Sequence, residues 1–345
     1  MSTFAVPIIV IGETQKHPNA DTLSLTEVEG CPVIFRTEEF KPGDLAVYIP
    51  IESVVPMNNR AFTFLEQKES RQTHRVKAKK LRGIFSMGLL FPISILPSDL
   101  VWQVGDNVAT PLGIIKYEEP ETNMRLGCHR DHQPDSQICP VYDIESARKY
   151  HTVIVPRERV IVTEKIHGCN SRMVHRHDPK EEAPRLYVSS HRYFVKDRIE
   201  DVFWMAARKY DMATKLAQIP DFVVYGEVYG RVQDLKYGST LEDPIHYAAF
   251  DIYDSKAMHY IDYDNFKRIC TGLQIPMVPV LYDGPFDWTI IESLASGNSI
   301  ITPSQIREGF VMRLGKERWD PKLGRIIIKL VGEQYHLRKD GTEYQ

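Results

Sequence analysis

Residues 163–172 read Thr-Glu-Lys-Ile-His-Gly-Cys-Asn-Ser-Arg, and they place Lys165 between an apolar strand expected at residues 160–163 and a turn that contains glycine. A lysine held in this way can face a pocket from a rigid support. To act as a nucleophile near pH 7 it must lose a proton, although the reference pKa of lysine is about 10.4; burial or a nearby cation lowers that pKa. Taken alone, the stretch fits a surface lysine on a β-turn better. The assignment of Lys165 therefore depends on the motifs that follow it.

Five further stretches follow in order along the chain. Residues 189–192 read Ser-Ser-His-Arg, residues 225–230 read Tyr-Gly-Glu-Val-Tyr-Gly, residues 249–253 read Ala-Phe-Asp-Ile-Tyr, residues 307–313 read Arg-Glu-Gly-Phe-Val-Met-Arg, and residues 326–332 read Ile-Ile-Ile-Lys-Leu-Val-Gly. Each is a weak signal by itself. Their order and spacing resemble the covalent nucleotidyltransferase superfamily of ligases and capping enzymes. The Lys-x-His-Gly form, followed by Asn170, resembles ATP-dependent RNA ligases in particular, since DNA ligases and capping enzymes usually carry Asp where His167 stands.

The resemblance implies a role for each candidate site residue. Lys165 would attack the α-phosphorus of ATP, Lys329 would neutralise that phosphate, and Phe250 would stack on adenine. Glu227 would contact the ribose or organise the metal, and Glu308 would hold a divalent cation, Mg or Mn, as a hard oxygen ligand. The other residues expected to bind the nucleotide are Glu164, Asn170, Arg172, Arg192 and Arg313. Each has an ordinary alternative as a surface carboxylate, a solvated arginine or a core aromatic.

At two positions, Val331 and His167, the resemblance leaves the role of the residue less direct. Many relatives carry a second lysine where this chain has Val331, so we expect the second cation to come from elsewhere, with Arg325 or Arg338 as candidates. In similar RNA ligases the histidine corresponding to His167 matters for handling the polynucleotide, so His167 is expected to contribute to RNA binding. The alternative is a turn histidine without a function.

The N-terminal third predicts a separate small β-barrel. Short strands are expected at residues 7–11, 23–28, 32–37, 44–51, 75–79 and 88–92, separated by turns rich in Pro, Gly, Asn and Asp. Only residues 332–345 follow the last motif, so the barrel that DNA ligases and capping enzymes place there has no room. The barrel-first order resembles an RNA ligase family with an N-terminal OB domain, and residues 17–21, 42–50 and 82–88 share that resemblance.

The predicted organisation is an OB-like domain at residues 1–115, a linker at 116–139 and a nucleotidyltransferase domain at 140–345. The second domain alternates strands and helices, which indicates a mixed α+β fold with antiparallel sheets. We expect strands at residues 160–163, 186–189, 222–228, 246–252, 309–313 and 325–331. Helices are expected at residues 143–150, 202–217, 263–271 and 288–297.

A basic run in the OB-like domain is a candidate RNA-binding surface. Strand alternation would place Arg75, Lys77 and Lys79 on one face of the strand at residues 75–79, where they could follow a polynucleotide backbone. The alternative is a solvated edge strand, in which lysine protects against aggregation.

Charge, cysteine content and the length of apolar runs bear on where the protein functions in the cell, but they do not identify its activity. The formal net charge of −3 means that any nucleic-acid surface must be a local concentration of Lys and Arg. Five cysteines without regular spacing, no signal-like start and no long apolar run favour a soluble intracellular protein, in the cytoplasm or nucleus. No membrane association and no obligate protein partner are expected.

The ordered motifs and their resemblance to RNA ligases imply an ATP-dependent RNA ligase. It would form a lysyl-AMP intermediate, adenylylate a 5′-phosphate and join it to a 3′-hydroxyl, with a nicked RNA duplex as the expected partner. Two alternatives stay open from the sequence: a catalytically inert, OB-containing RNA-binding protein, and a DNA ligase or capping-type nucleotidyltransferase.

Overall fold

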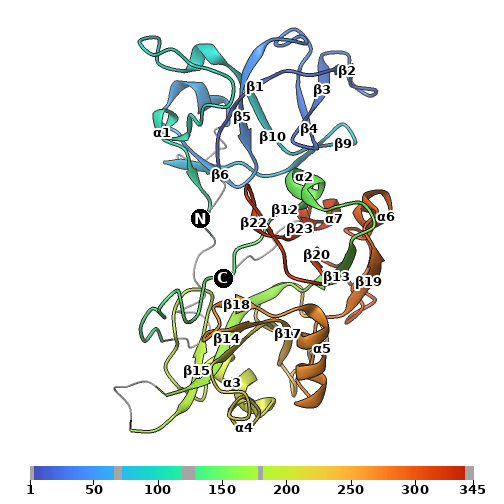
Figure 1. Ribbon diagram of the computed structural model, residues 1–345. Coiled ribbons are helices and arrows are strands. Elements are labelled where there is room, and N and C mark those ends of the chain that lie inside the picture. The colour runs from blue at the N-terminus through green and yellow to red at the C-terminus, as the bar shows by residue number, and fades with distance from the viewer. Residues whose placement is uncertain (1–3, 66–71, 119–128, 178–181, 339–345) are drawn as a thin grey trace. The chain divides into compact units, whose positions relative to one another are not determined.

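The computed structural model describes residues 4–65, 72–118, 129–177 and 182–338 of the chain. It divides into two compact units, Met1–Glu118 and Glu119–Gln345, each considered by itself below. Figure 1 shows both units, with many of their helices and strands labelled. Residues 129–139 of the predicted linker include Arg130, which bridges to Val195, and the buried Cys139, so this stretch packs within the second unit.

The N-terminal unit is built from short antiparallel strands. They are β1 (Ile8–Val10), β2 (Thr14–Lys16), β3 (Leu23–Val28), β4 (Cys31–Arg36), β5 (Leu45–Pro50), β6 (Ser53–Pro56), β7 (Thr73–Arg75), β8 (Lys79–Leu81), β9 (Ile84–Ser86), β10 (Gly88–Pro92) and β11 (Ile115–Lys116). They pair in the orders β1-β5-β10, β2-β3-β4, β11-β6-β7 and β8-β9. The helical elements are η1 (Arg60–Leu65), η2 (Ile93–Ile95) and α1 (Ala109–Leu112).

Strand β5 shows why this unit closes around two apolar clusters. Its consecutive side chains point to opposite faces. Val47 and Ile49 pack into one cluster with Phe62 and Phe91, whereas Tyr48 packs into the other. A strand that is buried on both faces needs sheet on both sides of it, which is the arrangement of a small barrel.

One predicted strand of this unit is wrong. Residues 75–79 do not form a single strand, because Arg75 ends β7 and Lys79 begins β8. The residues between them still alternate, with Val76 and Ala78 buried and Lys77 exposed. The apolar and polar periodicity was therefore correct. The backbone of Val76 still pairs with Glu52 and Ser53, but residues 76–78 do not continue as a strand.

The C-terminal unit contains two five-stranded sheets. One has the order β12-β23-β20-β13-β19 and the other β15-β14-β16-β17-β18. Their strands are β12 (Glu145–Ser146), β13 (Arg159–Lys165), β14 (Gly168–Arg176), β15 (Arg185–Ser189), β16 (Phe222–Gly230), β17 (Ile245–Asp254), β18 (His259–Tyr260), β19 (Val280–Pro285), β20 (Gly309–Leu314) and β23 (Ile327–Val331), and β21 (Trp319–Asp320) pairs with β22 (Gly324–Arg325). All pairings are antiparallel except that of β12 with β23.

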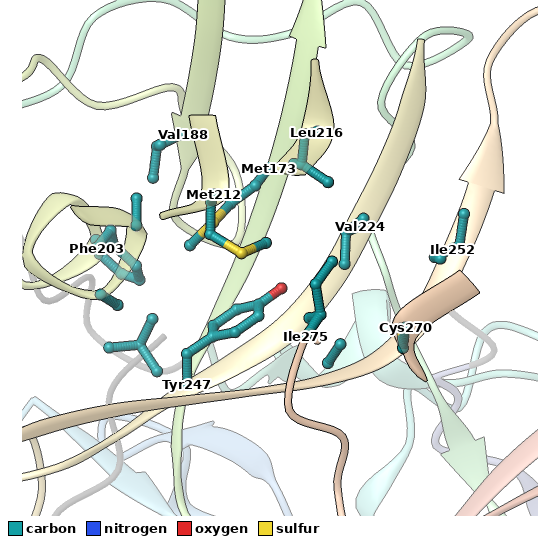
Figure 2. Close-up of a cluster of buried hydrophobic side chains, with 14 of the residues drawn as sticks. Met173, Val188, Phe203, Met212, Leu216, Val224, Tyr247, Ile252, Cys270 and Ile275 are labelled. Carbon is teal, nitrogen blue, oxygen red and sulfur yellow. The ribbon is translucent and has the colours of Figure 1, made fainter. Parts of the chain in front are cut away.

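Helices cover one face of each sheet. They are α2 (Ala147–Tyr150), η4 (His151–Val153), α3 (Val202–Lys209), α4 (Met212–Leu216), α5 (Tyr263–Gly272), α6 (Trp288–Ser293) and α7 (Glu333–His336). Figure 2 shows the core of the second sheet, where Met173 and Val224 of the strands meet Phe203, Met212 and Cys270 of α3, α4 and α5. A separate cluster joins β13, β20 and β23 to α2 and α6.

The remaining faces of the two sheets meet each other. Val174 and Tyr225 from one sheet lie in the same apolar cluster as Ile327 and Val311 from the other, together with Tyr142. The layer between the sheets is therefore formed by alternate residues of β14, β16, β20 and β23. Any side chain on the same face of these strands, or of β13, points into this layer.

Several expected elements of this unit differ in the structure. The helix expected at residues 202–217 is two helices, α3 and α4, because Asp211 adopts a left-handed conformation between them. Strands β14 and β19 were not predicted. The helix expected at 143–150 is only α2, preceded by β12, and the helix expected at 288–297 ends at Ser293. The α+β class with an N-terminal OB-type domain is confirmed.

The four cysteines among the described residues, Cys31, Cys139, Cys169 and Cys270, are buried free thiols. No helix in the described part of the chain is long and apolar enough to cross a membrane.

Candidate active site between two sheets

Lys165 lies at the last position of β13, where the chain leaves one sheet and enters the other. Lys165 is paired in register with Gly309 of β20, and Gly168 begins β14 three residues later. Both positions require glycine, because the neighbouring strand backbone lies too close for a side chain. A Cβ on Gly309 would lie 2.1 Å from the Leu330 carbonyl oxygen, and a Cβ on Gly168 would lie 2.4 Å from the Val228 carbonyl oxygen. The lysine is thus carried by a short, crowded crossing between two sheets.

The Lys165 ammonium is paired with Glu308. Nζ lies 2.6 Å from Glu308 Oε1; the lysine side chain is 24% exposed and the glutamate side chain 9%. Burial raises the pKa of the Glu308 carboxyl, but Lys165 and His167 more than offset this and hold the pKa at about 2. Glu308 is therefore ionised at neutral pH, and Lys165 is still reachable from solvent.

His167 is bound at both ring nitrogens. Nε2 lies 2.8 Å from Asp234 Oδ1, and Nδ1 lies 2.8 Å from the Tyr335 hydroxyl and 3.7 Å from Glu308 Oε2. Burial lowers the pKa of His167, but the hydrogen bond to Asp234 and the nearby negative charge of Glu308 outweigh it, so the pKa is raised. In the protonated ring both nitrogens donate, one to each side.

Helix α7 and the residues after it close this network. Arg338 Nε donates to Asp234 Oδ2 at 2.8 Å, and the guanidinium lies 3.6 Å above the Tyr335 ring. Charges consequently alternate along a continuous chain of contacts, which runs from Lys165 through Glu308, His167 and Asp234 to Arg338. Arg338 was one of the two arginines considered for the cation missing at Val331. The structure brings it to this network.

Lys329 faces the same layer as Lys165. The register pairs Thr163 of β13 with Val311 of β20, and Val311 with Lys329 of β23. Lys329 is therefore in line with Thr163, two strands away, and Lys165 lies two residues further along β13 on the same face. With ~4.8 Å between strands and ~3.4 Å per residue, their Cα atoms are about 12 Å apart. That separation leaves room for a nucleotide phosphate between the two amines.

Asn170 and Glu227 come from the opposite sheet and lie directly across from each other on β14 and β16. Because opposite residues share a face, both point into the layer between the sheets. Asn170 Oδ1 is buried, and within the described residues it has no hydrogen-bond partner. A buried acceptor of this kind costs free energy unless something donates to it, so it marks a position for a bound ligand.

Glu164 and Phe250 lie near these residues but are held differently. Glu164 is buried and follows the strand alternation, so it points away from Lys165; its Oε2 accepts from the Ile300 backbone N at 2.7 Å. Its Oε1 is buried and has no partner within the described residues. Phe250 is half-buried beside a bulge of β17, with its ring 5.0 Å from that of Tyr142.

Two arginines expected at the nucleotide are used by the protein itself. Arg172 is buried and donates to Ser189 Oγ at 2.8 Å and to the Cys139 carbonyl at 2.7 Å. Arg313 donates to Asp251 and to Glu317 at 2.8 and 2.6 Å. These contacts favour a structural role over direct phosphate binding.

Arg325 lies in the same buried network as Arg313. It is 2.6 Å from Asp251 and 2.7 Å from Glu317, so it does not extend toward Lys165 as a replacement for the missing lysine. Arg192 is half-buried in the loop after β15. Its proposed phosphate contact stays a prediction.

Comparison with known proteins assigns the family. Residues 158–331, half of the chain, match a family model described as RNA ligase.

The chain belongs to the RNA ligase family.

A second family model, described as an OB-fold domain, matches residues 6–93 of this RNA ligase. Comparison with curated proteins gives no match.

Solved structures of a Naegleria gruberi RNA ligase share the fold. A variant with ATP and Mn is 22% identical with a TM-score of 0.82, covering 96% of this chain and 98% of that one. A variant with AMP and Mn is 23% identical with a TM-score of 0.82 and the same coverage. The enzyme with PPi is 23% identical with a TM-score of 0.80, covering 96% and 97%. The order of an N-terminal OB domain and a ligase domain is thus shared along nearly the full length of both chains.

The basic residues of the OB domain of this RNA ligase are not equivalent. Arg75 is bound within the protein, because its guanidinium donates to Glu52 at 2.5 and 3.0 Å and lies 3.6 Å from the centre of the Tyr117 ring. Lys77 and Lys79 are exposed. The predicted RNA-binding face is therefore better represented by the two lysines than by Arg75.

Sequence reasoning missed Asp234 and Tyr335 in this RNA ligase. Asp234 lies in the loop after β16 and Tyr335 in α7, and neither belongs to one of the six motifs. No local signal distinguishes them, since their role follows only from contact with His167 across 67 and 168 residues of chain.

Proposed function

We propose that this RNA ligase uses ATP to join an RNA 3′-hydroxyl to a 5′-phosphate through a lysyl-AMP intermediate on Lys165. The observation that carries the proposal is the Lys165 amine at the crossing between two sheets, 2.6 Å from the buried carboxylate of Glu308. The Naegleria gruberi structures with ATP and Mn and with AMP and Mn support the choice of nucleotide.

In the first step the unprotonated Lys165 amine attacks the α-phosphorus, a phosphorus–nitrogen bond forms, one proton leaves the nitrogen for the solvent, and pyrophosphate leaves with the electron pair of the broken phosphoanhydride. Glu308 is a weak base because its pKa is about 2, so its function is to position the amine and not to remove its proton. Lys329 would stabilise the negative charge on the phosphate from the other side of the layer.

The residues present fit a divalent metal that is shared with the substrate. No group of three or more His, Cys, Asp or Glu side chains able to hold a metal occurs in the described ranges. Mg²⁺ and Mn²⁺ bind well through one or two carboxylates together with substrate phosphates and water, and Glu308 and Glu227 would supply those carboxylates. A cation there would compete with Lys165 for Glu308 and so favour the unprotonated amine.

Asp234 and Tyr335 act in this proposal as positioning residues. They hold the His167 ring from both sides at 2.8 Å, so that the ring faces Glu308 in one orientation. A fixed ring keeps the Glu308 carboxylate aimed at Lys165. His167 would remain beside the adenylate when the RNA 5′-phosphate enters, which agrees with its expected part in handling RNA.

The later steps move AMP and then release it. An oxygen of the RNA 5′-phosphate attacks the lysyl-AMP phosphorus and the lysine nitrogen leaves; the 3′-hydroxyl then attacks the activated phosphate and AMP leaves. The OB domain, proposed at residues 1–115 and joined through residues 116–139, would bind the nicked duplex through Lys77 and Lys79.

The test is covalent labelling with ATP that carries a labelled α-phosphate. Wild-type protein with Mg²⁺ or Mn²⁺ should retain label after denaturation, and Lys165→Ala should not. Lys256→Ala is a matched control, because it also removes a lysine–carboxylate pair, at 2.9 Å from Asp221, but on the surface of the same unit. Label on Lys165→Ala, or none on wild type with either metal, would overturn the proposal.

Labelling with GTP, RNA binding and nick sealing separate the remaining alternatives. An inert RNA-binding protein would bind RNA and take no label. A capping-type enzyme would take label from GTP in preference to ATP, and a DNA ligase would seal a nicked DNA duplex in preference to RNA.

A further inference from the structure

The hairpin of β21 and β22 presents an exposed tryptophan at the surface of the ligase unit. Trp319 is 73% exposed, the highest value among the exposed aromatic side chains of the described residues. A Cβ added to Gly324 would lie 3.4 Å from the Trp319 ring, so the indole rests against the glycine on the opposite strand. The other face of the ring is available to a planar partner.

The hairpin that carries Trp319 is held firmly. Asp320 Oδ1 accepts from the backbone N atoms of Lys322 and Leu323, which fixes the turn. Arg318 next to the tryptophan donates to both carboxylate oxygens of Glu158, at 3.1 and 2.7 Å. A large apolar ring on a rigid support, exposed to water, is a preorganised binding feature and not a loose surface residue.

The chemistry around the ring favours a polyanion. Between residues 316 and 325 the chain carries four cationic side chains and two acidic ones. Arg318 and Arg325 are paired with carboxylates, whereas Lys316 and Lys322 are exposed and stand before and after Trp319 in the sequence of the hairpin. An aromatic face between lysines is the combination that binds single-stranded nucleic acid, since bases stack on the ring while the amines attract phosphates.

The hairpin lies far from the proposed nucleophile. Arg318 is bonded to Glu158, immediately before β13, and Lys165 ends the same strand. Seven residues of strand at ~3.3 Å each separate these points by about 20 Å. At ~3.4 Å per stacked nucleotide, this corresponds to about six nucleotides.

We propose that Trp319 stacks on a base in a single-stranded arm of the RNA substrate, about six nucleotides from the joint, with Lys316 and Lys322 bound to the phosphates of that arm. This inference rests on the proposed function, because it takes the reacting RNA end to lie at Lys165. It adds a second RNA contact on the ligase unit, remote from Lys165. This contact favours RNA substrates that are long enough to reach from the joint to Trp319.

Binding of RNA to Trp319→Ala and Trp319→Phe tests the proposal. Stacking of one base is worth ~1–3 kcal/mol, so Trp319→Ala should weaken binding of an RNA with long arms roughly tenfold. Trp319→Phe should retain most of the affinity while losing the quenching of tryptophan fluorescence that RNA causes in the wild type. Ile199→Ala is the matched control, since Ile199 is 86% exposed in the same unit and lies on no such hairpin.

Substrate length sharpens the test. RNAs with arms of about twelve nucleotides should distinguish wild type from Trp319→Ala, and RNAs with arms of about four should not reach the ring. Equal affinities of wild type and Trp319→Ala for the long RNA, or an equal loss for both lengths, would overturn the proposal. Lysyl-AMP formation should be unchanged in every variant. If wild type forms no lysyl-AMP, the proposed function fails, and that outcome is distinct from a failure at Trp319.

Discussion

Replacing Glu308 with Gln removes the negative charge that lies between Lys165 and His167 while keeping nearly the same shape. The change leaves the Lys165 ammonium and the His167 ring facing a neutral amide in a buried site. The pKa of Glu308 falls from 4.5 to about 2 in the folded protein. At ~1.4 kcal/mol per pH unit, its ionised form contributes about 3 kcal/mol to the free energy of unfolding.

The sign of this contribution sets its pH dependence. The folded-state pKa is lower than the ordinary value, so the stabilisation is complete above pH 4.5 and is lost as pH falls toward 2. Wild type and Glu308→Gln should therefore differ most at neutral pH and converge in acid. For a unit of this size ~1 kcal/mol shifts Tm by about 2–4 °C, so a difference of about 6–12 °C is expected at pH 7.

Thermal unfolding of both proteins between pH 3 and pH 8, in buffer with EDTA so that metal does not contribute, measures the effect. Glu292→Gln is the control, because Glu292 forms a half-exposed pair with Arg148 at 2.7 Å, and such pairs contribute ~1 kcal/mol or less. Equal Tm values for wild type and Glu308→Gln at pH 7 would refute the reasoning. A difference that persists unchanged at pH 3 would show that lost packing, and not lost charge, is responsible.

Three other substitutions test separate parts of the structure. Asp251→Asn should cost ~3–5 kcal/mol in urea unfolding at pH 7, because it removes the fully buried one of the two carboxylates, Asp251 and Glu317, that pair with the buried guanidinium groups of Arg313 and Arg325. Burial raises the pKa of Asp251 but the two arginines lower it further, so the loss should shrink as pH falls below 3.8. Tyr335→Phe removes the hydroxyl that is hydrogen-bonded to His167. The rate constant kcat for lysyl-AMP formation should fall roughly tenfold, with a smaller change in KM for ATP. A change in KM alone would contradict a positioning role for Tyr335. Replacing Lys77 and Lys79 together with Ala should weaken RNA binding and reduce the slope of log K against log salt by about 2, and an unchanged slope would exclude both from phosphate contact.

Strands could be predicted where a stretch of strand-favouring residues is bounded by turn residues. The expected strands at residues 23–28 and 88–92 coincide with β3 and β10, both bounded by turn residues. Strand β14 was missed because it begins with Gly168 and carries Asn170 and Arg172, residues that lower strand propensity. Its pairing with β15 and β16 outweighs that local preference.

The site was predictable as a set of motifs and not as a set of contacts. The motif residues Lys165 and Glu308 do meet, and Lys329 shares their face. Whether an arginine binds substrate or protein depends on what surrounds it. Arg172 and Arg313 look like phosphate ligands in the sequence, but in the structure both donate to buried hydroxyl, carbonyl and carboxylate oxygens of the protein. Only tertiary structure supplies those partners.

The alternating charges from Lys165 to Arg338 have a consequence for the proposed reaction. When Lys165 becomes lysyl-AMP, its nitrogen loses the positive charge that Glu308 faces at 2.6 Å. Glu308 then keeps the His167 ring, whose pKa is raised, as its neighbour, and His167 is retained by Asp234, which Arg338 balances in turn. A buried carboxylate that lost every cation would have to take up a proton or move. The network therefore allows the site to hold one arrangement in two charge states, before and after the nucleotide is attached, and this explains why residues as distant in sequence as Asp234 and Tyr335 surround a single imidazole.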